Sequence, residues 1–202
     1  MPSTKERIIA NAQTLFTRQG IANTRLQHIA DETGISVGNL AYHFSTKEEI
    51  VQTVYYHALE ELSHILIVPA PLPGLKSFDN TFSEMFQFME KNVFYFTNFW
   101  EIKRNYPLLN EKIININKKV VSRLRRRIVQ NAEINLWQKE DHKAMYYLLS
   151  QIILISFNTW ISQQLLNDKP LKESIFKTYL WSLLYPHFTQ QGKYQFKSLK
   201  IF

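Results

Sequence analysis

A short segment near the N-terminus holds the side chains whose types and spacing could recognise a nucleic acid. It reads GISVGNLAYHFSTKEE, from Gly34 to Glu49. Asn39 can form two hydrogen bonds with the edge of an adenine, and Val37 can contact the methyl group of a thymine. Ser36 is a residue type that often caps a helix N-terminus. These residues predict a brief helix that is presented to another surface.

The element before this segment is predicted as a helix from about Thr4 to Gln19. Ser3 stands three residues before Glu6, which allows each side chain to bind the other's backbone amide in a capping box. Apolar residues follow at helical spacing. Gly20 can adopt the left-handed conformation that ends a helix.

The next two helices are predicted to be short. Thr24 is expected to open the second helix, with Gln27 as its capping partner, and Gly34 is expected to end it. Ser36 then caps a third helix that runs through about His43. Two helices joined by a glycine turn, the second one brief, form a helix-turn-helix pattern.

The two sides of the third helix have different compositions. Leu40 and Phe44 are four residues apart and can both face the protein interior. Val37, Asn39 and Tyr42 then point elsewhere, and Gly38 leaves room for another surface to approach the backbone.

A fourth helix follows, at about residues 46–67, and either Ser45 or Thr46 can cap it. The stretch VPAPLPG, from Val68 to Gly74, is the one clear linker, because proline disfavours helix at its own position and at the one before it. We therefore expect a small domain at residues 1–47, the helix at about 46–67 as a connection, and a larger domain at 48–202.

Helical periodicity continues through the larger domain. An apolar stripe runs from Phe78 to Phe96, Pro107 fits the first turn of a long helix, and an uncharged helix spans about residues 144–167. Asp168 and Pro170 are expected to start a last helix. No strand pattern occurs, so the expected fold class is all-α, and the segment after Pro186 has no assignment.

From about Thr4 to Val54 the chain resembles the DNA-binding region of TetR-family transcriptional regulators. The resemblance rests on RII at residues 7–9, LF at 15–16 before Gly20, Thr24 before an IA pair at 29–30, GISVGNLAYHF at 34–44, and KEE at 47–49. It implies an N-terminal three-helix domain that binds duplex DNA and a larger helical domain for effector binding and dimerisation.

The resemblance also implies roles for particular residues. Thr24 matches a residue that meets a phosphate at a helix N-terminus, and His43 and Lys47 match positions that touch the DNA backbone. Ala41 stands where the family commonly has tyrosine, so either Tyr42 takes over part of that role or a neighbouring base is read differently. The predicted DNA-binding residues are Thr24, Arg25, Gln27, Ser36, Val37, Gly38, Asn39, Tyr42, His43 and Lys47.

Aromatic and methionine side chains in the larger domain are expected mainly to form its core. They can also line a pocket for a small, mainly apolar effector, to which Glu90 can offer a charge. The predicted ligand-binding residues are Phe82, Met85, Phe86, Met89, Glu90, Phe96, Trp100, Phe157 and Trp160. The resemblance further implies a homodimer formed through the last two helices, with repression as the commoner outcome and activation left open.

Two other functions stay open: a constitutive DNA-binding dimer without an effector, and a helical carrier of small molecules. The net charge of +7 suits an acidic partner, but the densest basic run, Lys118 to Arg127, is expected to be a solvated helix face. The chain has no cysteine, which excludes disulfides and thiolate zinc sites. No catalytic motif occurs. We expect a cytoplasmic protein that is not an enzyme, with no cofactor, no metal site and no membrane span.

Overall fold

The regular elements of the described chain are helices, as the sequence predicts. The computed structural model describes residues 2–67 and 72–199. Within these residues no strand forms, and the sole strand-like feature is an isolated bridge between Trp137 and Phe188. Val68 to Pro71 of the predicted linker lie outside the described residues.

The chain divides into two units, and their boundaries differ from the predicted 1–47 and 48–202. One unit contains Met1–Glu61 and Asn92–Ile113, and the other contains Leu62–Lys91 and Ile114–Phe202. We call them the N-terminal unit and the C-terminal unit. Helices α4 and α8 continue from one unit into the other.

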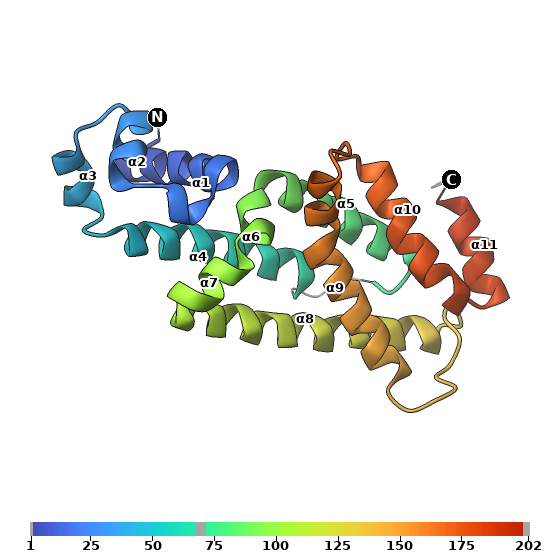
Figure 1. Ribbon diagram of the computed structural model, residues 1–202. Helices are drawn as coiled ribbons and strands as arrows, with labels where there is room; N and C mark the ends of the chain where they lie inside the picture. Colours follow the sequence, from blue (N-terminus) through green and yellow to red (C-terminus); the bar gives the residue numbers. More distant parts are fainter. Residues whose placement is uncertain (1, 68–71, 200–202) are drawn as a thin grey trace. The chain divides into compact units, whose positions relative to one another are not determined.

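The N-terminal unit combines the first helices of the chain with a segment from later in the chain (Figure 1). Its helices are α1 (Thr4–Asn23), α2 (Leu26–Thr33), α3 (Val37–His43), most of α4 (Lys47–Leu66), α6 (Val93–Thr97), α7 (Phe99–Asn105) and the start of α8 (Pro107–Glu133).

Helix α1 begins as predicted and ends later than predicted. Ser3 Oγ accepts a hydrogen bond from the Glu6 amide at 3.2 Å, and the Ser3 amide donates to Glu6 Oε2 at 2.7 Å. The bond from the Ser3 amide, and after it a bond of 2.9 Å from Ser3 Oγ to Glu6 Oε2, lower the pKa of Glu6. Gly20 has the predicted positive φ, 79°, but the chain resumes helical geometry beyond it to Asn23.

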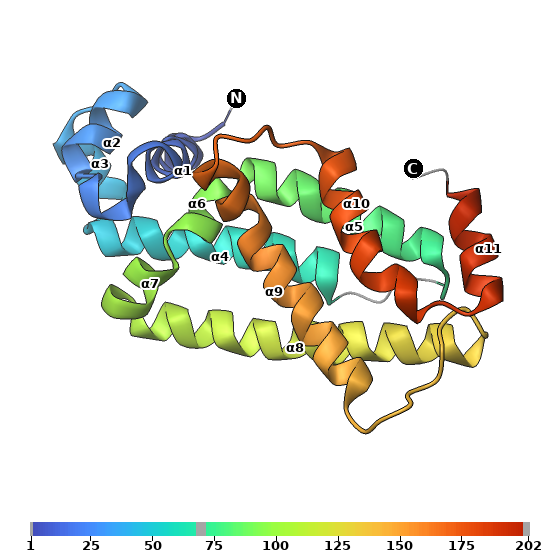
Figure 2. The same cartoon turned by 45° about the vertical axis from the view of Figure 1, so that its right-hand side comes forward.

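The C-terminal unit is built from longer helices, with α10 beside α5 (Figure 2). Its further helices are α5 (Leu75–Lys91), α9 (Met145–Leu166), α10 (Glu173–Leu184), the 3-10 turn η1 (Tyr185–His187) and α11 (Gln190–Ser198). The predicted stripe from Phe78 to Phe96 is therefore interrupted, since α5 ends before Asn92. The predicted helix at Asp168 and Pro170 starts only at Glu173, because Asp168 adopts a left-handed φ of 51°.

Helix α11 occupies the segment that the sequence left unassigned. Thr189 caps it, with Oγ1 accepting from the Gly192 amide at 3.0 Å. Phe196 is buried and its ring lies 5.2 Å from that of Trp181 and 5.3 Å from that of Tyr185. The end of the chain thus contributes to the core, so the two helices predicted as the last ones are α9 and α10.

A buried carboxylate joins α5 to α10. Asp79 accepts from Lys177 Nζ at 3.2 Å, from Lys76 Nζ at 3.3 Å and from the indole nitrogen of Trp181 at 3.3 Å. Buried charges are tolerated when they are paired in this way.

The basic run on α8 is exposed at most of its charges but not at Arg127. The Arg127 guanidinium lies 4.1 Å from the centre of the Phe78 ring and donates to Thr81 Oγ1 at 3.0 Å and Ser77 Oγ at 3.1 Å. Burial lowers the pKa of Arg127 to about 10. The prediction of a solvated face was wrong for this residue, which is a packing element.

In the part of the chain that the structure describes, no helix combines the length and the apolarity needed to span a bilayer.

Candidate nucleic-acid interface

Helix α3 is fixed to the N-terminal unit by few contacts, as its sequence predicts. Ser36 caps it, with Oγ accepting from the Asn39 amide at 3.1 Å. Leu40 is fully buried and Phe44, which follows the helix, is nearly so. Gly34 holds the turn before it with a φ of 71°. The predicted cap, anchors and turn glycine are all confirmed.

The remaining residues of α3 form an outward surface. Gly38, Asn39, Ala41 and Tyr42 are exposed, and the side chain of Tyr42 stands out with 86% of its surface accessible. Within the described residues the side chains of Asn39 and Tyr42 form no hydrogen bond. Their polar groups are therefore available to an external partner, and an exposed tyrosine of this kind is a recurrent feature of binding surfaces.

The second predicted glycine of this region, Gly38, has no steric role within the chain. A β-carbon built on it would have Ser36 Oγ as its nearest neighbour, at 3.9 Å, and its φ is not in the left-handed region. A glycine inside a helix lowers helix stability by about 1 kcal/mol relative to alanine. The absence of a side chain at Gly38 therefore leaves space for a surface that approaches α3 from outside the chain.

The N-terminus of α2 is a second candidate contact. Its first backbone bond within the helix runs from the Ile29 amide to the Arg25 carbonyl, at 3.3 Å. The amides of residues 26–28 precede it and have no partner within the helix, and the helix dipole there favours an anion. Arg25 is exposed beside them. Gln27 is exposed too, but its amide donates to Asp31 Oδ1 at 2.6 Å.

Thr24 does not have the predicted role. Its side chain is only 1% exposed, its hydroxyl donates to the Gly20 carbonyl at 2.8 Å, and its amide donates to the Ile21 carbonyl at 3.1 Å. Both donors are thus used within the chain. Thr24 closes the end of α1. The N-cap position of α2 is Arg25, not Thr24, and the Arg25 amide donates to His28 Nδ1 at 3.3 Å where Gln27 was the predicted partner.

Lys47 is also bound within the chain. Its Nζ donates to the Ile21 carbonyl at 2.6 Å, and burial lowers its pKa, partly offset by Glu101 and Glu48. The Ile21 amide in turn donates to Asn98 Oδ1 at 3.3 Å. Lys47 therefore ties the start of α4 to the end of α1, and only its remaining N–H groups can reach a phosphate.

The start of α4 resolves an alternative that the sequence left open. The Glu49 amide donates to Thr46 Oγ1 at 3.2 Å, and the Ser45 amide donates to Glu49 Oε2 at 2.7 Å. Thr46 is thus the residue whose side chain caps this helix.

The predicted ligand-binding residues are divided between the two units. In the C-terminal unit, Phe82 and Phe157 have ring centres 6.1 Å apart and Phe86 and Trp160 have centres 6.2 Å apart. Phe176, not among the predictions, joins them, 5.0 Å from Trp160. We call this group the aromatic cluster. Met85 and Met89 are also buried and lie on α5, the helix of Phe82 and Phe86, while Glu90 on the same helix is exposed.

The other two predicted residues belong to the N-terminal unit. Phe96 is buried there. Trp100 is 68% exposed and lies under the Lys103 ammonium group, 5.3 Å from it.

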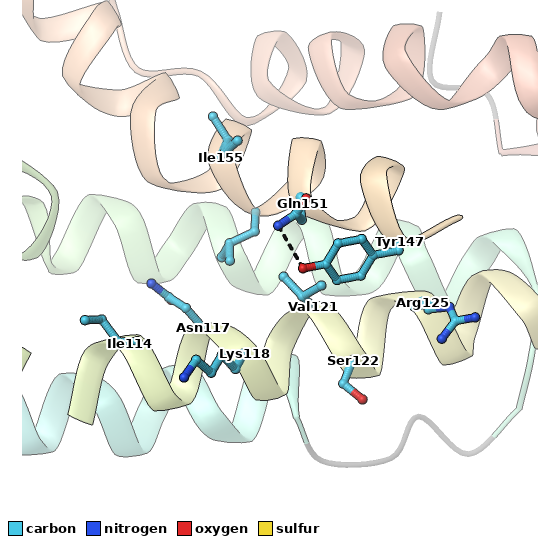
Figure 3. A pocket seen from close by; sticks show the side chains of 10 residues that line it. Ile114, Asn117, Lys118, Val121, Ser122, Arg125, Tyr147, Gln151 and Ile155 are labelled. Atoms are coloured by element: carbon cyan, nitrogen blue, oxygen red, sulfur yellow. Dashed lines mark hydrogen bonds between the residues drawn. The ribbon is translucent and has the colours of Figure 1, made fainter. Parts of the chain in front are cut away.

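A pocket that the sequence did not reveal lies in the C-terminal unit between α8 and α9 (Figure 3). It has a volume of about 490 Å³, and none of the nine predicted ligand-binding residues lines it. Its walls come from two consecutive helices, and the space depends on how these helices cross, so no local pattern could have indicated it. Among the residues that are described, no three His, Asp or Glu side chains are grouped as a metal site would require.

Comparison with known families identifies the segment that contains this interface. Residues 8–54 match the family of bacterial regulatory proteins called the tetR family. Two curated relatives are HTH-type transcriptional regulators: YerO of Bacillus subtilis, 45% identical over 51 residues, and RutR of Escherichia coli K12, 31% identical over 103 residues. The matches cover 25% and 51% of this chain but only 18% and 42% of the relatives. The chain therefore spans less than half the length of either relative in these matches.

Solved structures resemble the whole fold. A TetR-family regulator from Marinobacter aquaeolei has a TM-score of 0.89 at 18% identity, over 98% of this chain and 97% of that one. The regulator PfmR of Thermus thermophilus has a TM-score of 0.70 at 25% identity, over 89% and 97%. The first shows a shared fold, and the second agrees with the match of residues 8–54. Residues 8–54 therefore match the DNA-binding segment of the tetR family of bacterial regulatory proteins, and the chain as a whole shares the fold of TetR-family structures.

Proposed function

We propose that the protein is a ligand-responsive repressor that binds a near-palindromic DNA operator as a homodimer. The observation that carries this proposal is the outward surface of α3. It joins a glycine that the fold does not need to two polar side chains, Asn39 and Tyr42, that form no hydrogen bond within the described chain. A helix of this kind fits the major groove, where it reads base edges.

Contacts to the DNA backbone would come from α2 and from the flanks of α3. The free amides at the start of α2, with Arg25 beside them, suit a phosphate. Val37 and His43 are half-buried at the two ends of α3 and border its outward surface. Ser36 caps α3 at the start of this surface. The side chain of Tyr42 is 86% exposed, so it can supply part of the DNA contact that Ala41 lacks, the contact that tyrosine makes at this position in the family.

Dimerisation through α9 and α10 is supported by their exposed apolar faces. On α9, Leu148, Ile152 and Ile155 are 48%, 45% and 59% exposed, at spacings of four and three residues. On α10, Ile175 and Tyr179 are exposed four residues apart. Contiguous exposed apolar faces of this kind mark protein interfaces. A dimer built on them would present two α3 helices to successive major grooves, roughly 34–36 Å apart.

The effector would be small and mainly apolar, bound at the aromatic cluster of the C-terminal unit. Its five buried side chains are packed together, so binding would require them to separate in one of two conformations. A ligand shifts the population only if it binds the two conformations with different affinity.

The conformational signal would reach α3 through α4. Two side chains bind the backbone of Ile21. Lys47, at the start of α4, donates to its carbonyl, and Asn98, between α6 and α7, accepts from its amide. A displacement of α4 would therefore displace the end of α1, against which α2 packs, and α3 packs against α2 in turn. A constitutive DNA-binding dimer would show the same interface without this response.

The experiment that tests this proposal compares Asn39→Ala with Arg25→Ala. Asn39→Ala should cost about 1–3 kcal/mol of affinity for the preferred site and flatten the preference among bases at one position. Arg25→Ala should weaken binding to all sequences alike and lower the slope of log K against log salt by about 1. Fluorescence anisotropy with operator and scrambled duplexes, at several salt concentrations, measures both quantities.

Both side chains are exposed and make no side-chain hydrogen bond in the described chain, so neither substitution should change the melting temperature. Equal losses on operator and scrambled DNA for both variants would show that α3 does not read bases. Tight binding of an apolar ligand by a protein with no DNA binding at moderate salt would instead favour a carrier.

A further inference from the structure

The pocket between α8 and α9 has apolar walls and a basic edge. Ile114 and Val121 come from α8, and Leu154 and Ile155 come from α9. Figure 3 shows Tyr147 and Gln151 projecting from α9, with the Gln151 amide donating to the tyrosine hydroxyl at 3.1 Å. At about 490 Å³ the pocket is within the range of small-molecule sites.

The charges of the pocket have one sign. Lys118 and Arg125 line it from α8, while α9 contains no charged residue at all. No carboxylate in the described parts of the chain pairs with either cation. Two further cations, Lys119 and Arg126, stand next to them on the exposed side of α8. The field at the pocket edge therefore attracts an anion.

One polar atom in the wall of the pocket is unpaired. Asn117 belongs to the lining, and its Oδ1 is buried and has no hydrogen-bond partner. A buried acceptor without a partner is costly, so a ligand hydroxyl or protonated acid group that reached it after a rotation of the amide would be favoured. The pocket thus combines apolar walls with two cations that no carboxylate of the described chain pairs, and an unmet acceptor lies behind its surface.

From this combination we propose that the α8–α9 pocket binds an anionic amphiphile, a molecule with one apolar chain and a carboxylate or phosphate head. The chain would lie against Val121, Leu154 and Ile155, and the head would lie between Lys118 and Arg125. An arginine guanidinium suits both head groups, because its N–H donors match two oxygens at once. This site is separate from the aromatic cluster proposed for the effector.

The pocket also adjoins the face proposed for dimerisation. Its α9 residues, Tyr147, Gln151 and Leu154, occupy the side of the helix next to the stripe of Leu148 and Ile152, and Ile155 belongs to both. Occupation of the pocket by an amphiphile would therefore place its chain at the edge of the dimer interface, where it could alter dimer stability.

Calorimetric titration of the full chain without DNA tests the proposal. The probes are dodecanoate, dodecyl phosphate and dodecyltrimethylammonium, each below its micellar concentration. We expect the two anions to bind and the cation not to bind. The double variant Lys118→Gln/Arg125→Gln should weaken anion binding at least tenfold. A stronger effect on dodecyl phosphate than on dodecanoate would assign the head group as phosphate.

The matched control is Lys119→Gln/Arg126→Gln, which removes the same charge from the same helix outside the pocket and should leave binding within twofold of the original. Equal losses in both double variants, or unchanged binding in both, would overturn the proposal. An absence of anion binding when the chain is dimeric in solution would also overturn the proposal, since the pocket would then be closed by a second copy.

The result does not depend on the proposed function. Operator binding is measured on α3 variants with DNA, whereas these titrations contain none. Failure of the titration leaves the DNA result intact, and failure of operator binding leaves the titration interpretable.

Discussion

Replacement of Gly38 by alanine should weaken operator binding roughly tenfold to hundredfold while leaving the fold as stable as before or more stable. The added methyl group meets nothing closer than Ser36 Oγ at 3.9 Å, so the folded chain accepts it. Alanine in place of glycine within a helix is worth up to about 1 kcal/mol of stability. The loss would come from the DNA side, where the methyl group would separate α3 from the groove.

Thermal unfolding and anisotropy titration on one preparation check this pair of effects. Gly34→Ala is the matched control for stability, because its φ of 71° disfavours any residue with a β-carbon and the melting temperature should fall. If Gly38→Ala binds the operator as well as the original protein does, α3 does not approach DNA by its Gly38 side.

The same substitution at Gly192 should have the opposite effect on stability. A β-carbon on Gly192 would lie 2.0 Å from the Leu136 carbonyl oxygen and 3.1 Å from the Phe188 β-carbon. The carbonyl belongs to the backbone and cannot rotate away, so α11 must shift or detach. Overpacking of this severity costs about 3 kcal/mol, and for a chain of this size that lowers the melting temperature by roughly 6–12 °C.

Hydrogen exchange localises the expected change. The amides of α11 should lose protection first. Two interactions hold α11 to the segment at Leu136: the close contact of Gly192, and a hydrogen bond of 3.2 Å that the Thr189 amide donates to the Leu136 carbonyl. Tyr194→Ala on α11 is the control, since that side chain is 80% exposed and should matter little. Unchanged protection in Gly192→Ala would contradict the close packing of α11 described above.

The features predicted correctly from the sequence are those set by local interactions. The Ser3 and Ser36 caps, the turn glycines and the anchors Leu40 and Phe44 depend on residues three or four positions apart. Such interactions are visible in the order of residues because helical geometry fixes which positions meet.

The errors arose where distant segments decide. Lys47 has the residue type expected at a phosphate, but its Nζ donates to the carbonyl of Ile21, which lies 26 positions earlier in the chain. The sequence predicted Arg127 as an exposed cation, but in the structure Phe78, Thr81 and Ser77 of α5 contact its guanidinium. Tertiary packing decides which of several chemically competent partners a polar group takes, and a single sequence does not contain that information.

The pocket between α8 and α9 failed to appear in the sequence for a related reason. Its apolar residues have ordinary core spacing on each helix, and only the crossing of the two helices leaves a space between them. The sequence analysis instead predicted a ligand pocket lined by aromatic residues. Most of these residues are packed against one another in the aromatic cluster.

The central claim, that two copies of α3 read a specific duplex, is tested most directly by selecting bound sites from a pool of random DNA with the full chain at moderate salt. The account predicts enrichment of one near-palindromic sequence whose half-sites are centred about 10 base pairs, or a multiple of that, apart. It also predicts that Asn39→Ala loses the preference at one position in each half-site. Recovery of no preferred sequence, with binding that depends on salt and duplex length alone, would contradict it.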